Sequence, residues 1–229
     1  MSDTRVSRAS LFEIPLWTAQ FDEVLPYHEE MAHEVEQLID RDNAADGGPP
    51  RFLAHQTASD PFELPSPGWR LLERLSNQAY GDLAKAHFQR WRSGEFHLRR
   101  WAIRFGRLSA LDKARLERDS VHNHLPALFS SIYYLRVPPE FVENPEGGSM
   151  FVNPFANLMD LMAPRTRIIA PKEGRFLVFP AFVDHTPVPI QWDSAGVSRI
   201  VVSSDVFYVS GKSRRATALP VIQAEPDRS

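Results

Sequence analysis

The sequence predicts an α+β fold in which two amphipathic helices precede a β-rich barrel or sandwich. Apolar residues recur every three to five positions in two stretches before residue 92, whereas short runs of β-branched and aromatic residues follow residue 95. Glycine- and proline-containing turns separate most of these runs. Helices followed by strands are typical of the α+β class, and 229 residues suffice for one domain with its own core.

The N-terminal part, residues 1–94, is expected to be mainly helical. Residues 11–17 alternate loosely and contain Pro15, which cannot donate a ladder hydrogen bond and therefore suits an edge strand. A helix is expected over residues 25–42 and a second helical region over residues 68–91. The first helix has its apolar residues three or four positions apart at Met31, Val35, Leu38 and Ile39.

The β-rich core is expected over residues 95–210. Its strands are predicted at residues 96–105, 130–137, 150–153, 166–169, 175–179 and 198–208. Between the first two, mixed charges and leucines near helical spacing in residues 108–119 indicate a short inserted helix or a mobile loop. Residues 211–229 are polar and contain proline, so they are expected to form a surface tail.

The composition excludes several kinds of site. The formal net charge is -3, with acidic and basic residues interleaved, so nucleic acid is not an expected partner. The chain has no cysteine, which leaves histidine and carboxylate side chains as the strong metal ligands. No run of about 18 apolar residues indicates a membrane span, and a cytoplasmic protein is expected.

Three histidines are candidate metal ligands. His122 and His124 flank one asparagine just before a predicted strand, and residues i and i+2 of an extended segment project to the same side. His185 follows a glycine turn and a hydrophobic strand that could deliver it to the same ion. Each pattern alone is also typical of ordinary loop histidines, so their combination with later residues matters.

Arg199 begins the apolar strand that follows His185. An arginine there is ordinarily a rim charge, but an inward guanidinium could hold a carboxylate through two parallel hydrogen bonds. Side chains alternate along a strand, so an inward Arg199 brings Ser203 to the interior with it.

These residues together resemble the 2-oxoglutarate/Fe(II) oxygenase superfamily. The resemblance lies in an H-x-[D/H] pair, a strand, a run similar to Gly-x-Leu-x-Phe-Pro at residues 174–180, a distal histidine and a later arginine. It extends to a bacterial and phage subfamily of 2-oxoglutarate/Fe(II) oxygenases, through five segments. These are residues 122–124, 130–135, 151–154, 174–185 and 199–204, and residues 11–17 resemble its N-terminal strand.

The resemblance implies a double-stranded β-helix, or jelly roll, with the N-terminal helices packed on one sheet. It implies Fe(II) held by His122, His124 and His185, and the cosubstrate 2-oxoglutarate held by Arg199. Tyr134 lies in a run similar to a prolyl hydroxylase strand in which a tyrosine assists that arginine. The implied reaction is hydroxylation of an unknown small molecule or peptide, with succinate and CO₂ as co-products.

His124 departs from the superfamily's usual pattern, in which this ligand is a carboxylate. Two neutral imidazoles and a carboxylate leave an Fe(II) site with one net positive charge, whereas three imidazoles leave two. Two alternatives therefore stay open: a three-histidine iron dioxygenase that uses no oxoacid, and a jelly-roll binding protein without turnover. Arg199 favours the oxoacid-dependent enzyme over the first alternative.

Overall fold

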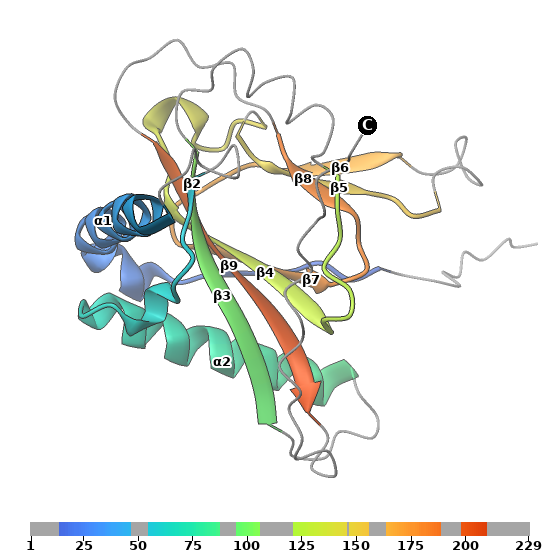
Figure 1. Ribbon diagram of the computed structural model, residues 1–229. Coiled ribbons are helices and arrows are strands. Elements are labelled where there is room, and N and C mark those ends of the chain that lie inside the picture. The colour runs from blue at the N-terminus through green and yellow to red at the C-terminus, as the bar shows by residue number, and fades with distance from the viewer. Residues whose placement is uncertain are drawn as a thin grey trace, which may run out of the picture.

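The computed structural model describes residues 14–46, 55–87, 95–105, 121–145, 147–155, 164–188 and 198–209. In these residues two antiparallel sheets lie face to face, and two long helices cover the outer side of the larger sheet (Figure 1). The predicted insert at residues 108–119 and the predicted tail at residues 211–229 lie outside the described residues.

The larger sheet has six strands. Their order across the sheet is β1 (Trp17–Gln20), β7 (Arg175–Pro180), β4 (Phe129–Arg136), β9 (Arg199–Val209), β3 (Glu95–Phe105) and β2 (His55–Gln56). The smaller sheet has the order β6 (Thr166–Ile169), β5 (Ser149–Val152) and β8 (His185–Pro187). The two sheets form the expected double-stranded β-helix, and the α+β prediction is confirmed.

The helices pack on the outer face of the six-stranded sheet (Figure 1). They are α1 (His28–Asp46) and α2 (Pro67–His87), with short 3-10 helices at η1 (Asp22–Tyr27), η2 (Pro61–Glu63) and η3 (Pro139–Phe141). Buried apolar side chains of both long helices meet alternate residues of the central strands, such as Tyr133 and Val202. The buried helix residues are Met31, Ala32, Val35 and Ile39 of α1, and Trp69, Leu72 and Tyr80 of α2.

The inner face of the same sheet forms a second apolar cluster with the smaller sheet. Because successive side chains alternate, Tyr133 packs against the helices while Tyr134 packs inside. The same alternation places Val201 inside and Val202 outside. Positions 199, 203 and 205 share the inner face with Val201, so one strand presents a row of polar residues to the interior.

The predicted edge strand is shifted along the chain. The prediction ended at Trp17, whereas β1 begins there, and Ile14 to Leu16 form no strand. Pro15 cannot donate a hydrogen bond to a partner strand. The edge position is confirmed, because β1 pairs only with β7 in the described sheet. None of the described helices is long and apolar enough to span a membrane.

Candidate metal centre

Backbone pairing brings the three candidate histidines together. The peptide N–H of His122 donates to the carbonyl of His185 at 3.0 Å, and the N–H of His185 donates to the carbonyl of His122 at 2.9 Å. The N–H of His124 donates to the carbonyl of Ala181 at 2.8 Å. The segment that precedes β4 is therefore tied to the chain that enters β8.

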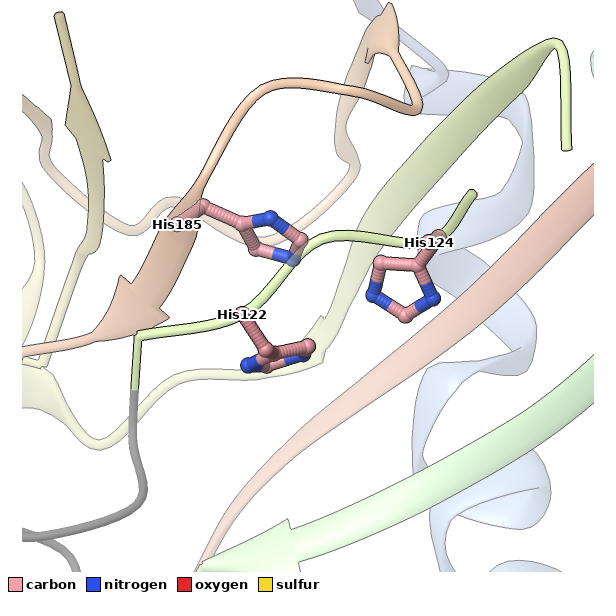
Figure 2. A group of neighbouring side chains, drawn as sticks. All are labelled: His122, His124 and His185. Atoms are coloured by element: carbon pink, nitrogen blue, oxygen red, sulfur yellow. The ribbon is translucent and has the colours of Figure 1, made fainter. Parts of the chain in front are cut away.

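The three imidazoles face a common point (Figure 2). One ring nitrogen from each of His122, His124 and His185 lies within 4.8 Å of those of the other two. The ring centroids are 4.7 to 5.0 Å apart. His122 is exposed, His124 is half-buried and His185 is buried, so the cluster is open to solvent on one side. This donor set suits a first-row transition metal.

Two of the imidazoles are held in the tautomer that a metal ligand needs. Nδ1 of His185 lies 3.1 Å from the carbonyl oxygen of Val183, and Nδ1 of His124 lies 3.0 Å from a carboxylate oxygen of Asp205. A carbonyl or carboxylate can only accept, so each Nδ1 carries the hydrogen. The Nε2 lone pair of both neutral rings is then available for a metal.

Burial keeps His185 uncharged. Its side chain lies against the rings of Phe179 and Phe151, with centroids 4.7 and 6.1 Å away. This burial, together with repulsion from His122 and His124, lowers the pKa of His185 to about 3. A histidine must be neutral to bind a metal, so the donors present fit Fe(II).

Asp184, the carboxylate next to His185 in the sequence, does not join the cluster as a ligand. Asp184 accepts a hydrogen bond from the Asn123 side chain at 2.9 Å, on the side of the chain away from the histidines. Asp119 lies outside the described residues. The metal-ligating groups that the structure describes here are therefore three imidazoles.

Arg199 is a buried cation that no carboxylate among the described residues neutralises. Its side chain is 2% exposed, and its Nε has no hydrogen-bond partner. One terminal nitrogen donates to the Gly148 carbonyl at 3.4 Å, and the guanidinium lies 4.1 Å from the centre of the Phe105 ring. Among the described residues no carboxylate pairs with it. Burial lowers the pKa of Arg199 to about 10, so the group is still charged at neutral pH.

The guanidinium lies at a distance from the histidines that a dicarboxylate could bridge. Gly148, which accepts from Arg199, is three residues before Phe151, and Phe151 pairs with His185 across the smaller sheet. Three strand residues span about 10 Å. A five-carbon chain with a carboxylate at each end can reach from a metal at the histidines to Arg199.

Tyr134 and Ser203 both lie on the inner face with Arg199. The Tyr134 hydroxyl is 2.7 Å from the Ser149 hydroxyl, which links the two sheets. Burial raises the pKa of Tyr134, and the nearby Arg199 charge partly opposes this effect. Ser203 is buried and pairs with Ile132 and Trp101 on the neighbouring strands. Both hydroxyls therefore line the interior that Arg199 enters.

Two residues that contact the histidines are not among those predicted from the sequence. Asp205 binds His124, and the Trp101 ring stacks on the His124 ring with centroids 5.7 Å apart. The alternation that placed Ser203 beside Arg199 also predicts Asp205 on that face, so this signal was present. Trp101 could not be predicted, because its pairing with Ser203 depends on a strand register that the sequence does not reveal.

A family model supports the sequence resemblance. Residues 112–205 match the family described as "Putative 2OG-Fe(II) oxygenase". This stretch includes the three histidines, Tyr134, Arg199, Ser203 and Asp205. No curated protein matches the chain.

Solved structures share the fold at low sequence identity. A prolyl-4-hydroxylase from Pseudomonas putida is 12% identical, with a TM-score of 0.51 over 86% of this chain and 94% of that one. HygX from Streptomyces hygroscopicus, with nickel, 2-oxoglutarate and hygromycin B bound, is 13% identical, with a TM-score of 0.48 over 85% of this chain and 83% of that one. The first likeness supports the double-stranded β-helix. Residues 112–205 are therefore similar to the 2OG-Fe(II) oxygenase family, whose name gives Fe(II) as the cofactor and 2-oxoglutarate as the cosubstrate.

Proposed function

We propose that this oxygenase hydroxylates its substrate while it converts 2-oxoglutarate and O₂ to succinate and CO₂. In this reaction one oxygen atom of O₂ enters succinate and the other enters the substrate. The proposed metal ligands are His122, His124 and His185. If bound there, Fe(II) would supply the redox chemistry that activates O₂, while 2-oxoglutarate and the substrate each provide two of the four electrons that reduce it.

The buried guanidinium of Arg199, which no carboxylate among the described residues neutralises, is the observation that carries this proposal. A buried charge without a partner is unfavourable, because burial removes its hydration without replacing it. A carboxylate that enters the interior would relieve that cost and accept two parallel hydrogen bonds. The 5-carboxylate of 2-oxoglutarate is such a group. A three-histidine dioxygenase that uses no oxoacid has no requirement for this cation.

Two hydroxyl groups are proposed to complete the carboxylate site. Tyr134 is near enough to Arg199 for the guanidinium charge to act on the pKa of the tyrosine, and Ser203 lies two positions beyond Val201 on the same face. Burial raises the pKa of Tyr134, which keeps it a neutral donor at physiological pH. Each hydroxyl could donate one hydrogen bond to the bound carboxylate, while Arg199 provides the charge.

The proposed substrate is a small molecule or a peptide that approaches from the solvent side of His122. His122 is the exposed member of the cluster, whereas His185 is enclosed by aromatic rings. The chain's net charge of -3 gives no reason to expect nucleic acid as the partner. The cytoplasm is the proposed compartment, because 2-oxoglutarate is a cytoplasmic metabolite.

Isotope labelling tests the proposed reaction. The Fe(II)-loaded protein would be incubated with 2-oxoglutarate under ¹⁸O₂, and the succinate analysed by mass spectrometry, with His185→Ala as the inactive control. We expect succinate that carries one ¹⁸O atom, formed by the wild type alone. Oxygen consumption without succinate would favour the dioxygenase that uses no oxoacid. If neither succinate nor oxygen consumption is observed with substrate libraries, the chain is a binding protein and the proposal is wrong.

A further inference from the structure

Asp205 is a buried carboxylate that contacts one proposed metal ligand from behind. It lies on the inner face of β9 and is 3% exposed. Its two oxygens lie 3.0 and 3.2 Å from Nδ1 of His124. The Ser130 hydroxyl on β4 donates to Oδ1 at 2.8 Å. Ser130 and Asp205 are register partners, so the sheet itself fixes this carboxylate.

No lysine or arginine among the described residues neutralises this carboxylate. Arg99 is its register partner on β3, but the Arg99 guanidinium is placed over the Trp101 ring, 5.3 Å from its centre. The nearby Tyr80 is buried, which raises its pKa to about 12, so it adds no charge. Asp205 is therefore directed toward His124 and toward the metal that His124 would bind.

The Asp205 carboxylate places a negative charge next to His124, in a centre whose three imidazole ligands carry none. Three neutral ligands leave two positive charges on an Fe(II) site, one more than the usual set with a carboxylate. A carboxylate bonded to the far nitrogen of a ligating histidine raises the basicity of that ligand and fixes its orientation. A charge held one imidazole away from the metal acts in the same direction as a carboxylate ligand.

We propose that Asp205 is a positioning residue that holds His124 in the metal-binding tautomer. Its negative charge lies on the side of His124 away from the metal and replaces the charge that a direct carboxylate ligand would supply. This inference rests on the proposed function, because it requires His124 to bind the metal. It explains how the family's fold accommodates histidine at this ligand position.

The first test is anaerobic titration of the protein with Fe(II). Asp205→Asn keeps the size and one acceptor oxygen but removes the charge, and we expect about 10- to 100-fold weaker metal binding. In the complex with 2-oxoglutarate, the metal-to-ligand charge-transfer band should move to higher energy, since the metal loses electron density. Ser204→Ala is the matched control, because Ser204 is the buried neighbour that faces the helices. It should leave both readouts unchanged.

The Asp205→Asn substitution in the His124→Asp variant separates the effect of the Asp205 charge from a general structural role of Asp205. In His124→Asp the ligand itself carries a negative charge and faces Asp205, so the two carboxylates repel each other. Adding Asp205→Asn to His124→Asp should therefore strengthen metal binding, whereas the same change weakens it in the wild type. A role in folding alone would weaken binding in both backgrounds, and that result would overturn the inference.

His124→Ala distinguishes failure of the inference from failure of the proposed function. If His124→Ala weakens Fe(II) binding but Asp205→Asn binds as the wild type does, the ligand set stands and the role of Asp205 is wrong. If His124→Ala binds Fe(II) as tightly as the wild type, His124 is no ligand, and both the ligand set and the inference fail. Unfolding curves of every variant confirm that the compared proteins are folded.

Discussion

His124 is the residue at which the candidate centre differs from the usual two-histidine, one-carboxylate site. Its ring is held by the Asp205 carboxylate and by the stacked Trp101 ring, and its backbone N–H is bonded to the Ala181 carbonyl. A histidine held this firmly has lost its side-chain entropy before any ligand arrives. The arrangement is suited to binding a metal through Nε2 rather than to a mobile role in proton transfer.

Removing single imidazoles should reveal the ligand set. We expect His185→Ala to abolish Fe(II) binding and His124→Ala to weaken it by more than roughly 100-fold. Losing a residue that only hydrogen-bonds to a metal ligand already lowers metal affinity about 10- to 100-fold. His124→Asp should retain binding, because it restores a ligating carboxylate. Isothermal titration calorimetry under anaerobic conditions measures the Fe(II) affinity of all three variants.

A histidine far from the cluster provides the control for these variants. His33→Ala removes an imidazole on the exposed side of α1, where Nε2 of His33 lies 2.8 Å from Nε2 of Gln37. This variant should bind Fe(II) as tightly as the wild type. Stoichiometric, wild-type binding by His185→Ala would show that the three histidines do not form the metal site.

The sequence predicts the three histidines of the candidate centre but not the residues that hold them, and the reason is physical. The i, i+2 spacing placed His122 and His124 on one side, and the structure brings His185 to them. Asp205 could have been found from the same alternation along its strand. Trp101 could not, because its position depends on which residues of β3 and β9 are paired, and neither strand alone contains that information.

At the scale of elements, β9 connects the two ends of the candidate site. Arg199 is its first residue and Asp205 lies six positions later on the same face, between β4 and β3. A one-residue slip of this strand would turn both charged side chains toward the helices. The long pairing with β3, from Glu95 with Val209 to Phe105 with Arg199, holds the register.

The turn before β7 is a second element on which the site depends. Gly174 has a φ of +76°, its N–H donates to the Tyr134 carbonyl at 3.0 Å, and its carbonyl accepts from Phe21 at 2.8 Å. Gly174→Ala should lower the free energy of unfolding by about 1–3 kcal/mol, because the left-handed conformation is strained for alanine. An added Cβ would also lie 2.6 Å from Nε2 of Gln20.

Gly81→Ala is the matched control for Gly174→Ala. Gly81 lies in helix α2 with open space around its Cα, so alanine should stabilise the protein by about 0.5–1 kcal/mol. Urea unfolding followed by circular dichroism gives both values. Equal effects of the two substitutions would contradict the assigned backbone conformations.

Sequence periodicity predicted the longer elements and missed the shortest. β3, β4, β5, β6, β7 and β9 lie within one or two residues of their predicted bounds. β2 and β8 have two and three residues, which is too short for an alternating pattern to be recognised. α1 begins at His28 rather than Leu25, because the segment that contains Pro26 forms the 3-10 helix η1.

At the scale of the whole molecule, the outer face of the six-stranded sheet contributes stability and its inner face carries the candidate site. The helices bury an apolar core on the outer face, with buried residues from α1, α2 and the central strands. The inner face carries the buried polar residues Arg199, Ser203 and Asp205 beneath the smaller sheet. The outer core supplies the stability that allows the inner face to keep a buried cation that no carboxylate in the described part of the chain neutralises.

The most direct test of the account is whether that cation binds 2-oxoglutarate. The anaerobic Fe(II) protein would be titrated with 2-oxoglutarate, and binding read from the metal-to-ligand charge-transfer absorbance. The variants are Arg199→Ala and Arg199→Lys. Arg104→Ala is the control, because Arg104 lies on the neighbouring strand β3 and pairs with Asp40 of α1.

We expect a saturable band in the wild type and in Arg104→Ala. Arg199→Ala should lose about 2–5 kcal/mol of binding energy, which is roughly thirty- to several-thousand-fold in affinity. Arg199→Lys should recover only part of it, because a point charge cannot form the two parallel hydrogen bonds. Fe(II) affinity should stay unchanged in both variants. If the wild type shows no saturable band, or if Arg199→Ala binds 2-oxoglutarate as tightly as the wild type, the oxoacid-dependent function is contradicted.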